Sequence, residues 1–210
     1  MDLRIFELPP IGTNAYLLVD LQRAEAVAVD APLNAFATVE KVLVETGCRL
    51  TALLMTHGHW DHLLDGHRFN AFDTPVYGHV GDQMFFEDPA VMASFAMPGM
   101  AMEPTRVDLW VTGGATLELL GQSVEVRHVP GHSPGSVLYY WPQLEVAFSG
   151  DVVFAGSVGR TDFPGCSFEE LATSIRRSVY TLPDATTLFP GHGPRTTVGQ
   201  EAGHNTYVTR

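Results

Sequence analysis

The stretch that decides the fold is "LLMTHGHWDHLLDG", residues 53–66, in which three histidines and an aspartate fall within the six positions 57–62. An apolar run of strand length, "LTALLMT" at 50–56, leads into this cluster. Such a run indicates a strand buried on both faces. Because α/β folds commonly present functional side chains where a buried strand ends, the sequence predicts a functional site here.

The four side chains of the cluster are suited to metal binding. His57 and His59 lie two residues apart, so in extended backbone they point to the same side and can bind one cation together. Asp61 and His62 follow where the chain turns into a predicted helix, and they can point to a second position beside the first. Imidazole and carboxylate suit zinc, iron or manganese, and the absence of cysteine disfavours a closed structural zinc site.

Three later segments place a further histidine or aspartate after a predicted strand, each beside glycine. These residues are His132 in "HVPGHSPGS", Asp151 in "VAFSGDVVF" and His192 in "LFPGHGP". Their repeated position at strand ends indicates that they join the first cluster. The remaining histidines lack this context and are interpreted as ordinary side chains outside the site, namely His67, His79, His128 and His204.

The rest of the chain predicts two β-rich halves, each with helices. In the first half, strands are expected at 3–8, 15–20, 26–30, 50–56 and 75–79, and a helix from an Asn34 cap to Gly47. In the second half, a hairpin is expected with Gly121-Gln122 as its turn, then strands at 136–141 and 144–150, and a helix capped by Ser167. This order predicts two sheets packed face to face under outer helices, in a single domain over 1–210.

Residues 82–105 are unusual because they hold five of the seven methionines, together with three phenylalanines. Methionine-rich segments can line adaptable apolar binding surfaces. A loosely packed helical insertion that covers the core explains the same composition, so both interpretations stay open.

Composition limits the class of protein. The chain has 210 residues and a net charge of −12, which disfavours nucleic-acid binding because phosphate contact needs a basic surface. Cys48 and Cys166 match no metal or disulfide spacing and are expected to be reduced thiols. There is no secretory signal at the N-terminus and no apolar stretch of about 20 residues, so we predict a soluble cytoplasmic protein with a small-molecule substrate. The sequence does not indicate which oligomeric state the protein adopts.

Taken in order, "THGHWDH", "PGHSPG", "SGD" and "PGHGP" resemble the metallo-β-lactamase fold superfamily over nearly the whole chain. The resemblance implies an αββα sandwich of two mixed β-sheets with outer helices and a binuclear metal site at one edge of the sheets. It implies that one ion is bound by His57, His59 and His132, the second by Asp61, His62 and His192, and that Asp151 bridges both. Asp30, in "VAVD", would hydrogen-bond a ligand, although Asp30-Ala31-Pro32 replaces the family's usual Asp-Pro-Gly.

Within the superfamily, the sequence resembles the short bacterial glyoxalase II-like hydrolases. Asp151 stands where β-lactamases usually have cysteine, and His59 where flavo-diiron oxygen reductases have glutamate. "GSVGRTDFPG" at 156–165 strengthens the match. The resemblance implies two divalent ions, zinc first and iron or manganese as alternatives, and hydrolysis of thioesters such as hydroxyacylglutathione by a metal-bridging hydroxide.

The predicted chemistry assigns roles to a few further groups. Asp61 and Asp151 are the candidate catalytic carboxylates, able to carry protons but weakly basic when metal-bound. Arg160 and Arg195, each beside a motif loop, are the candidate substrate cations, although Asp162 can pair with Arg160.

Two other functions remain open. Persulfide dioxygenases share "GRTDF" and the histidine loops, and use one iron, which here would be bound by His57, His132 and Asp151. A metal-stabilised binding module without turnover is the third possibility.

Overall fold

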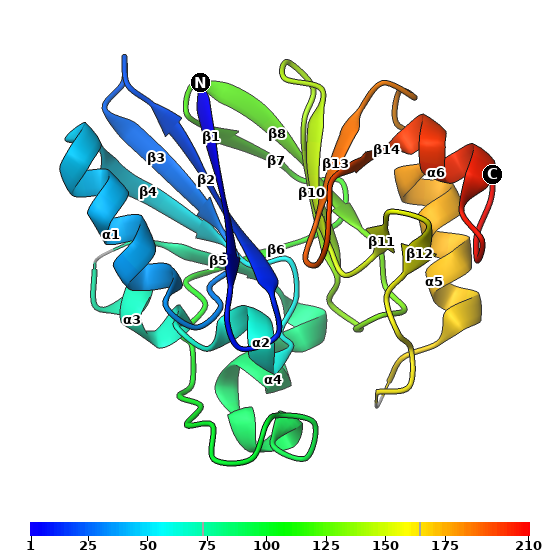
Figure 1. The fold of residues 1–210 in the computed structure, drawn as a ribbon, viewed down its shortest axis with the longest axis horizontal. Coiled ribbons are helices and arrows are strands. Elements are labelled where there is room, and N and C mark those ends of the chain that lie inside the picture. The colour runs from blue at the N-terminus through cyan, green and yellow to red at the C-terminus, as the bar shows by residue number, and fades with distance from the viewer. Residues whose placement is uncertain (73, 164) are drawn as a thin grey trace.

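The computed structural model describes residues 1–72, 74–163 and 165–210, and its strands form two six-stranded sheets (Figure 1). The first sheet has the order β1 (Asp2–Leu8), β2 (Thr13–Asp20), β3 (Glu25–Val29), β4 (Arg49–Leu54), β5 (Val76–His79) and β6 (Leu109–Val111). The second has the order β14 (Thr196–Thr197), β13 (Thr187–Pro190), β10 (Val146–Gly150), β9 (Val137–Trp141), β8 (Gln122–His128) and β7 (Thr116–Leu119). A short hairpin is added by β11 (Val153–Phe154) and β12 (Ser157–Val158).

Both sheets are mixed. In the first, β1 to β3 pair antiparallel and β3 to β6 pair parallel. In the second, all neighbours are antiparallel except β10 and β13. The predicted pair of mixed sheets is therefore confirmed.

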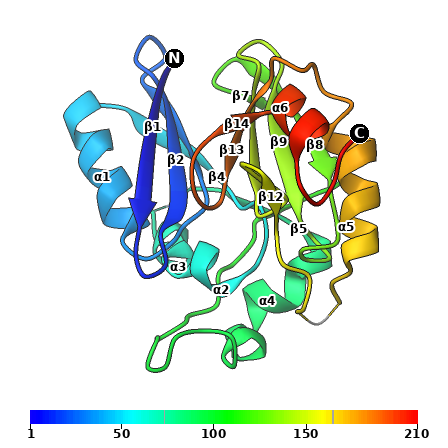
Figure 2. The same ribbon diagram turned by 45° about the vertical axis from the view of Figure 1, so that its right-hand side comes forward.

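The helices cover the outer faces of both sheets. On the first sheet lie α1 (Ala35–Thr46) and α3 (Gly66–Asn70), and on the second lie α5 (Phe168–Ser174) and α6 (Val198–His204), as Figures 1 and 2 show. The other short helices are α2 (Trp60–Leu63), α4 (Gln83–Glu87), η1 (Val80–Asp82), η2 (Pro89–Met92) and the π-helical turn η3 (Ile175–Val179). The layers form the predicted αββα sandwich.

The sandwich follows from strands that are apolar on both faces. In β2, Leu17 and Val19 pack in the apolar cluster under α1, whereas Tyr16 and Leu18 pack between the two sheets. The layer between the sheets buries large side chains from β9 and β10, among them Trp141. Burial on two faces explains why these strands read as continuous apolar runs.

Three local predictions are wrong in detail. Asn34 precedes α1, but it has φ 72° and its side chain makes no capping hydrogen bond. The hairpin turn consists of Leu120 and Gly121, both with positive φ as in a type I′ turn, rather than Gly121-Gln122. The helix predicted where the chain turns at Asp61 and His62 is not continuous but consists of the two short helices α2 and α3.

Ser167 caps α5 as predicted, since its Oγ accepts a hydrogen bond from the Glu170 backbone N–H at 3.3 Å. None of the helices in the described part of the chain combines the length and apolar character that crossing a bilayer requires.

Candidate metal centre

Loops at the ends of four strands carry five of the predicted site residues, and the short helix α2 carries Asp61 and His62. The loop between β4 and α2 carries His57 and His59, and the loop between β8 and β9 carries His132. Asp151 follows β10, and His192 lies in the loop between β13 and β14. Residues more than 130 positions apart in the chain therefore meet at one edge of the sandwich, as in the 131-residue separation of Asp61 and His192.

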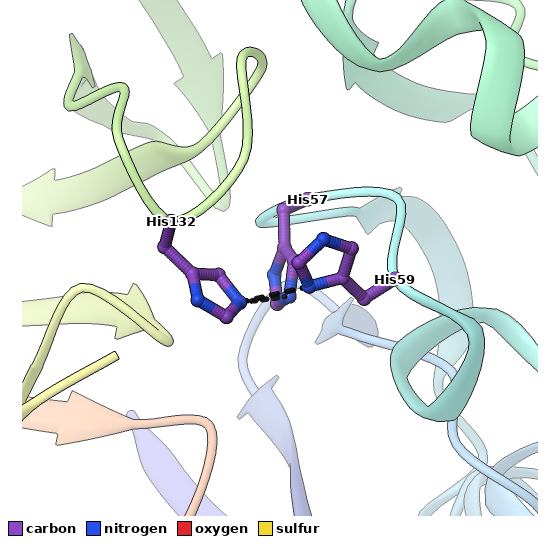
Figure 3. Close-up of side chains that lie close together, drawn as sticks. All are labelled: His57, His59 and His132. Carbon is purple, nitrogen blue, oxygen red and sulfur yellow. Dashed lines mark hydrogen bonds between the residues drawn. The ribbon is translucent and has the colours of Figure 1, made fainter. Parts of the chain in front are cut away.

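Three histidines direct ring nitrogens at one point (Figure 3). His59 Nδ1 lies 2.8 Å from His132 Nε2, and His57 Nε2 lies 3.2 Å from the same atom. All three side chains are buried, with 2% of each residue exposed. Three imidazoles that converge in this way can bind one cation.

The hydrogen-bond partners of the outer ring nitrogens determine which nitrogens are free to bind. Thr56 Oγ1 lies 2.8 Å from Asp30 Oδ2 and donates to that carboxylate, so it must accept from His57 Nδ1 at 3.0 Å. His132 Nδ1 lies 2.7 Å from the Arg160 carbonyl, which can only accept. Both histidines therefore present unprotonated Nε2 atoms 3.2 Å apart. Two lone pairs facing each other at this distance repel, and a cation between them removes the conflict.

A second group of ligand atoms adjoins the first. His62 Nδ1 donates to Asp30 Oδ2 at 3.0 Å, so His62 Nε2 is directed toward Asp61 Oδ2 at 3.4 Å. His192 Nε2 lies 3.1 Å from the same Asp61 oxygen. Asp61, His62 and His192 can therefore hold a second cation.

Asp151 lies between the two groups. Its Oδ1 is 3.3 Å from His62 Nε2, and its Oδ2 is 3.6 Å from both His132 Nε2 and His192 Nε2. Among the described residues, neither Asp151 Oδ1 nor His62 Nε2 has a hydrogen-bond partner, although both are buried. Such atoms are costly without a partner, and a bound cation would supply one to each.

The protonation states of the site suit metal binding. Burial lowers the pKa of His57, His59 and His132, which keeps these imidazoles neutral. Burial is the largest single effect on the pKa of Asp151 and raises it, but the neighbouring histidines His62, His132 and His192 together outweigh burial, so its pKa lies below the usual range. The site therefore combines neutral imidazoles with an ionised carboxylate.

Opposing effects also act on the second group. Burial lowers the pKa of His62, but the charges of Asp61, Asp151 and Asp30 outweigh burial and raise it well above the usual value. The His192 pKa is raised in the same way, because the hydrogen bond to Asp61 and the charges of Asp151 and Asp61 together outweigh burial. A metal cation would replace these protons as the positive partner of the carboxylates.

Three further residues support the site and were not predicted. Thr13 Oγ1, at the start of β2, donates to Asp61 Oδ2 at 2.8 Å. Thr56 orients His57, as described above. Asp82 is fully buried and accepts hydrogen bonds from the backbone N–H groups of Gly58 and Gly135 at 2.8 and 2.6 Å, so it joins two of the ligand loops.

The sequence patterns that could have revealed Asp82 and Thr13 differ in strength. Burial raises the pKa of Asp82 to about 6, although its hydrogen bonds oppose this shift. Asp82 follows a predicted strand beside glycine, which is the same pattern that identified Asp151, so the sequence did contain a signal for it. Thr13 has no comparable signal, because its contact spans 48 residues.

A hollow of about 550 Å³ opens over the candidate metal-binding side chains. Besides those side chains it is lined by Ile11, Trp60, Phe95, Met97, Phe154, Ser157, Val158, Arg160 and Phe163. The predicted substrate cation Arg160 therefore lies at the site, paired with Asp162. Arg195 lies instead in a separate hollow with Glu7 and Asn14.

Comparison with known proteins identifies the family to which the fold belongs. Residues 8–192 match the family model of the metallo-beta-lactamase superfamily. The chain is 34% identical to the probable metallo-hydrolase YqgX of Bacillus subtilis, over 99% of this chain and 98% of the relative. It is 33% identical to the hydroxyacylglutathione hydrolase GloC of Haemophilus influenzae, again over 99% and 98% of the two chains.

Solved structures agree with this assignment. The B3 metallo-beta-lactamase BLEG-1 superposes with a TM-score of 0.91 at 37% identity and full coverage of both chains. A di-iron-bound form of TTHA1623 superposes with a TM-score of 0.81 at 36% identity, over 98% of this chain and all of the other.

Proposed function

The chain belongs to the metallo-beta-lactamase superfamily, and from this premise we propose that it is a metal-dependent hydrolase that cleaves thioesters with two metal ions. The observation that carries the proposal is the position of Asp151, whose two oxygens face two adjacent groups of ligand atoms. The name of the Haemophilus influenzae relative, a hydroxyacylglutathione hydrolase, supports thioesters as the substrate class.

Two sets of side chains would hold the metal ions. One set is His57, His59 and His132, the other is Asp61, His62 and His192, and Asp151 would belong to both. Zinc is the first candidate because imidazole and carboxylate ligands suit it. Iron and manganese accept the same ligands, and the di-iron form of TTHA1623 makes iron a realistic alternative.

When bound, such ions would supply an activated water near neutral pH and would polarise a substrate carbonyl. The chain's own groups would position the reactants around them. Thr13 holds Asp61 through a hydrogen bond of 2.8 Å, and Asp30 fixes the ring of His62 at 3.0 Å. A thiolate leaves with little help from a general acid, so Asp61 and Asp151 would act mainly through their charge and would carry protons only secondarily.

The proposal extends to organisation and location. We propose that residues 1–210 act as one cytoplasmic domain on a small-molecule substrate. The layer of apolar side chains shared by the two sheets supports a single folding unit.

The variant His192→Ala tests the reaction class. In a thioesterase with two ions it removes a ligand of the second ion, and we expect S-lactoylglutathione hydrolysis to fall by at least about 100-fold. His204→Ala, which removes an exposed histidine of α6, is the matched control and should retain full activity.

A persulfide dioxygenase would respond differently to the same variant. Iron held by His57, His132 and Asp151 does not need His192. Oxygen uptake with glutathione persulfide that persists in His192→Ala, together with no thioester hydrolysis by the unmodified protein, would overturn the hydrolase proposal. Bound metal with neither activity would favour a binding module.

A further inference from the structure

We propose that the hollow over the metal centre selects thioesters with an apolar acyl group in preference to hydroxyacyl thioesters of charged thiols. This inference rests on the proposed function, because it names the substrate class of the same site. It is carried by the side chains that surround the metal-binding residues.

An aromatic wall stands directly against the candidate ligands. The Phe163 ring centroid lies 4.4 Å from that of His59 and 6.0 Å from that of His132. Phe95 extends the wall, with its ring centroid 4.9 Å from that of Phe163. A substrate carbonyl placed at the metal centre would therefore have apolar surface immediately beside it.

The mouth of the hollow exposes large apolar side chains to solvent. Phe95, Met97 and Ile11 line it and are 36%, 47% and 50% exposed. Three such side chains around one concavity are typical of a binding site for an apolar group. The unbranched side chain of Met97 can adapt to acyl chains of different length.

The segment that carries Phe95 and Met97 is anchored from behind. Trp60, Leu64, Phe85 and Met92 form a buried apolar cluster beneath it. Partly buried side chains of the same segment pack on this cluster, among them Ala96, Met100 and Met102. The methionine-rich segment therefore covers the core, and at Phe95 and Met97 it also lines the site. Both interpretations that the sequence left open thus apply to it.

Apart from the metal centre, the hollow offers little positive charge that could bind an anionic thiol carrier. Arg160 is the only arginine or lysine among the described residues that line it. Its guanidinium is engaged by both oxygens of Asp162 and lies 4.5 Å above the Phe163 ring. A carboxylate of glutathione would therefore have to share this guanidinium with Asp162.

A series of thioesters with one neutral thiol tests the inference. The zinc-loaded protein is assayed with lactoyl, acetyl, butanoyl and hexanoyl thioesters of N-acetylcysteamine, and with S-lactoylglutathione. We expect kcat/KM to rise about four-fold for each methylene that the hollow buries. We also expect the hexanoyl thioester to exceed both lactoyl substrates.

Variants locate the selectivity in the wall. Phe95→Ala and Met97→Ala should lower the ratio of hexanoyl to acetyl kcat/KM. Met84→Ala is the matched control, because Met84 lies in the same segment and is 53% exposed, but does not line the hollow. An unchanged ratio in both wall variants would overturn the inference.

Other outcomes separate the two proposals. Hydrolysis of the whole series with a flat profile, or with lactoyl substrates preferred, would overturn the inference and leave the thioesterase proposal intact. If no thioester is hydrolysed, the proposed function fails. Calorimetry of the non-hydrolysable thioether S-hexyl-N-acetylcysteamine then decides the inference, since binding that Met97→Ala weakens supports it and no binding refutes it.

Discussion

Gly191 offers the sharpest perturbation of the proposed metal centre. A Cβ added at this position would lie 2.1 Å from Asp151 Oδ1 and 2.5 Å from His62 Cε1. Ordinary contact begins near 3.4 Å, so Asp151 would have to move by about 1.3 Å. Metal ligands tolerate deviations of about 0.2 Å. Gly191→Ala should therefore prevent Asp151 from binding either ion in its present position.

The backbone at Gly191 cannot easily move away to relieve this contact. Its N–H donates to the Gly150 carbonyl at 2.8 Å, and its carbonyl accepts from the Asn14 N–H at 2.7 Å. We expect the overpacking to cost about 1–3 kcal/mol of unfolding free energy. The larger effect should be the loss of at least one bound ion and a fall in thioester hydrolysis of about 100-fold or more.

Metal analysis after dialysis and a thioester assay measure these effects. Gly203→Ala in α6 is the matched control, because a Cβ there meets nothing within 4 Å. It should keep both its metal and its activity. Gly191→Ala with two ions per chain and unchanged activity would refute the assignment of Asp151 and His62.

Three further predictions concern residues near the site. His128→Ala should leave the metal content unchanged, because His128 Nε2 is bound to the Pro134 carbonyl at 2.8 Å, and a drop in bound metal would show a wrong ligand set. Burial lowers the pKa of His79 to about 4, so the folded protein should bind fewer protons than the unfolded chain between pH 6.5 and 4. Urea unfolding should show that the unfolding free energy of wild type falls relative to that of His79→Gln as the pH falls through this window. A constant difference between the two proteins would contradict the lowered pKa of His79. Asp82→Ala should weaken metal binding about 10- to 100-fold in chelator competition, because Asp82 joins the two loops that carry candidate ligands. Unchanged affinity would show that these loops keep their positions without Asp82.

Sequence reasoning could predict those residues of the candidate site whose signals are local. His57 and His59 are two apart in extended backbone after an apolar strand, and this spacing alone brings their rings together. Asp151 and His192 could be added because each follows an apolar run beside glycine. The layers of the sandwich were predictable for the same reason, since strands such as β2 are apolar on both faces.

What the sequence could not supply depends on contacts between distant segments. Thr13 reaches Asp61 across 48 residues, and no pattern within either segment indicates this pair. Arg195 is close to His192 in the chain, but it lines a different hollow. The hairpin turn at Leu120-Gly121 was displaced by one residue because the pairing of Leu119 with Gln122 sets its register. Position along the chain was a poor guide in each of these cases.

Reconstitution of the metal-free protein tests the central claim most directly. Zinc is added in steps while bound metal and thioester hydrolysis are measured, for wild type and for Asp151→Ala. We predict that wild type binds two ions per chain and reaches full activity only as the second site fills, whereas Asp151→Ala loses at least one ion and nearly all hydrolysis. Full activity at one ion per chain, or in Asp151→Ala, would contradict a centre in which Asp151 is shared by two ions.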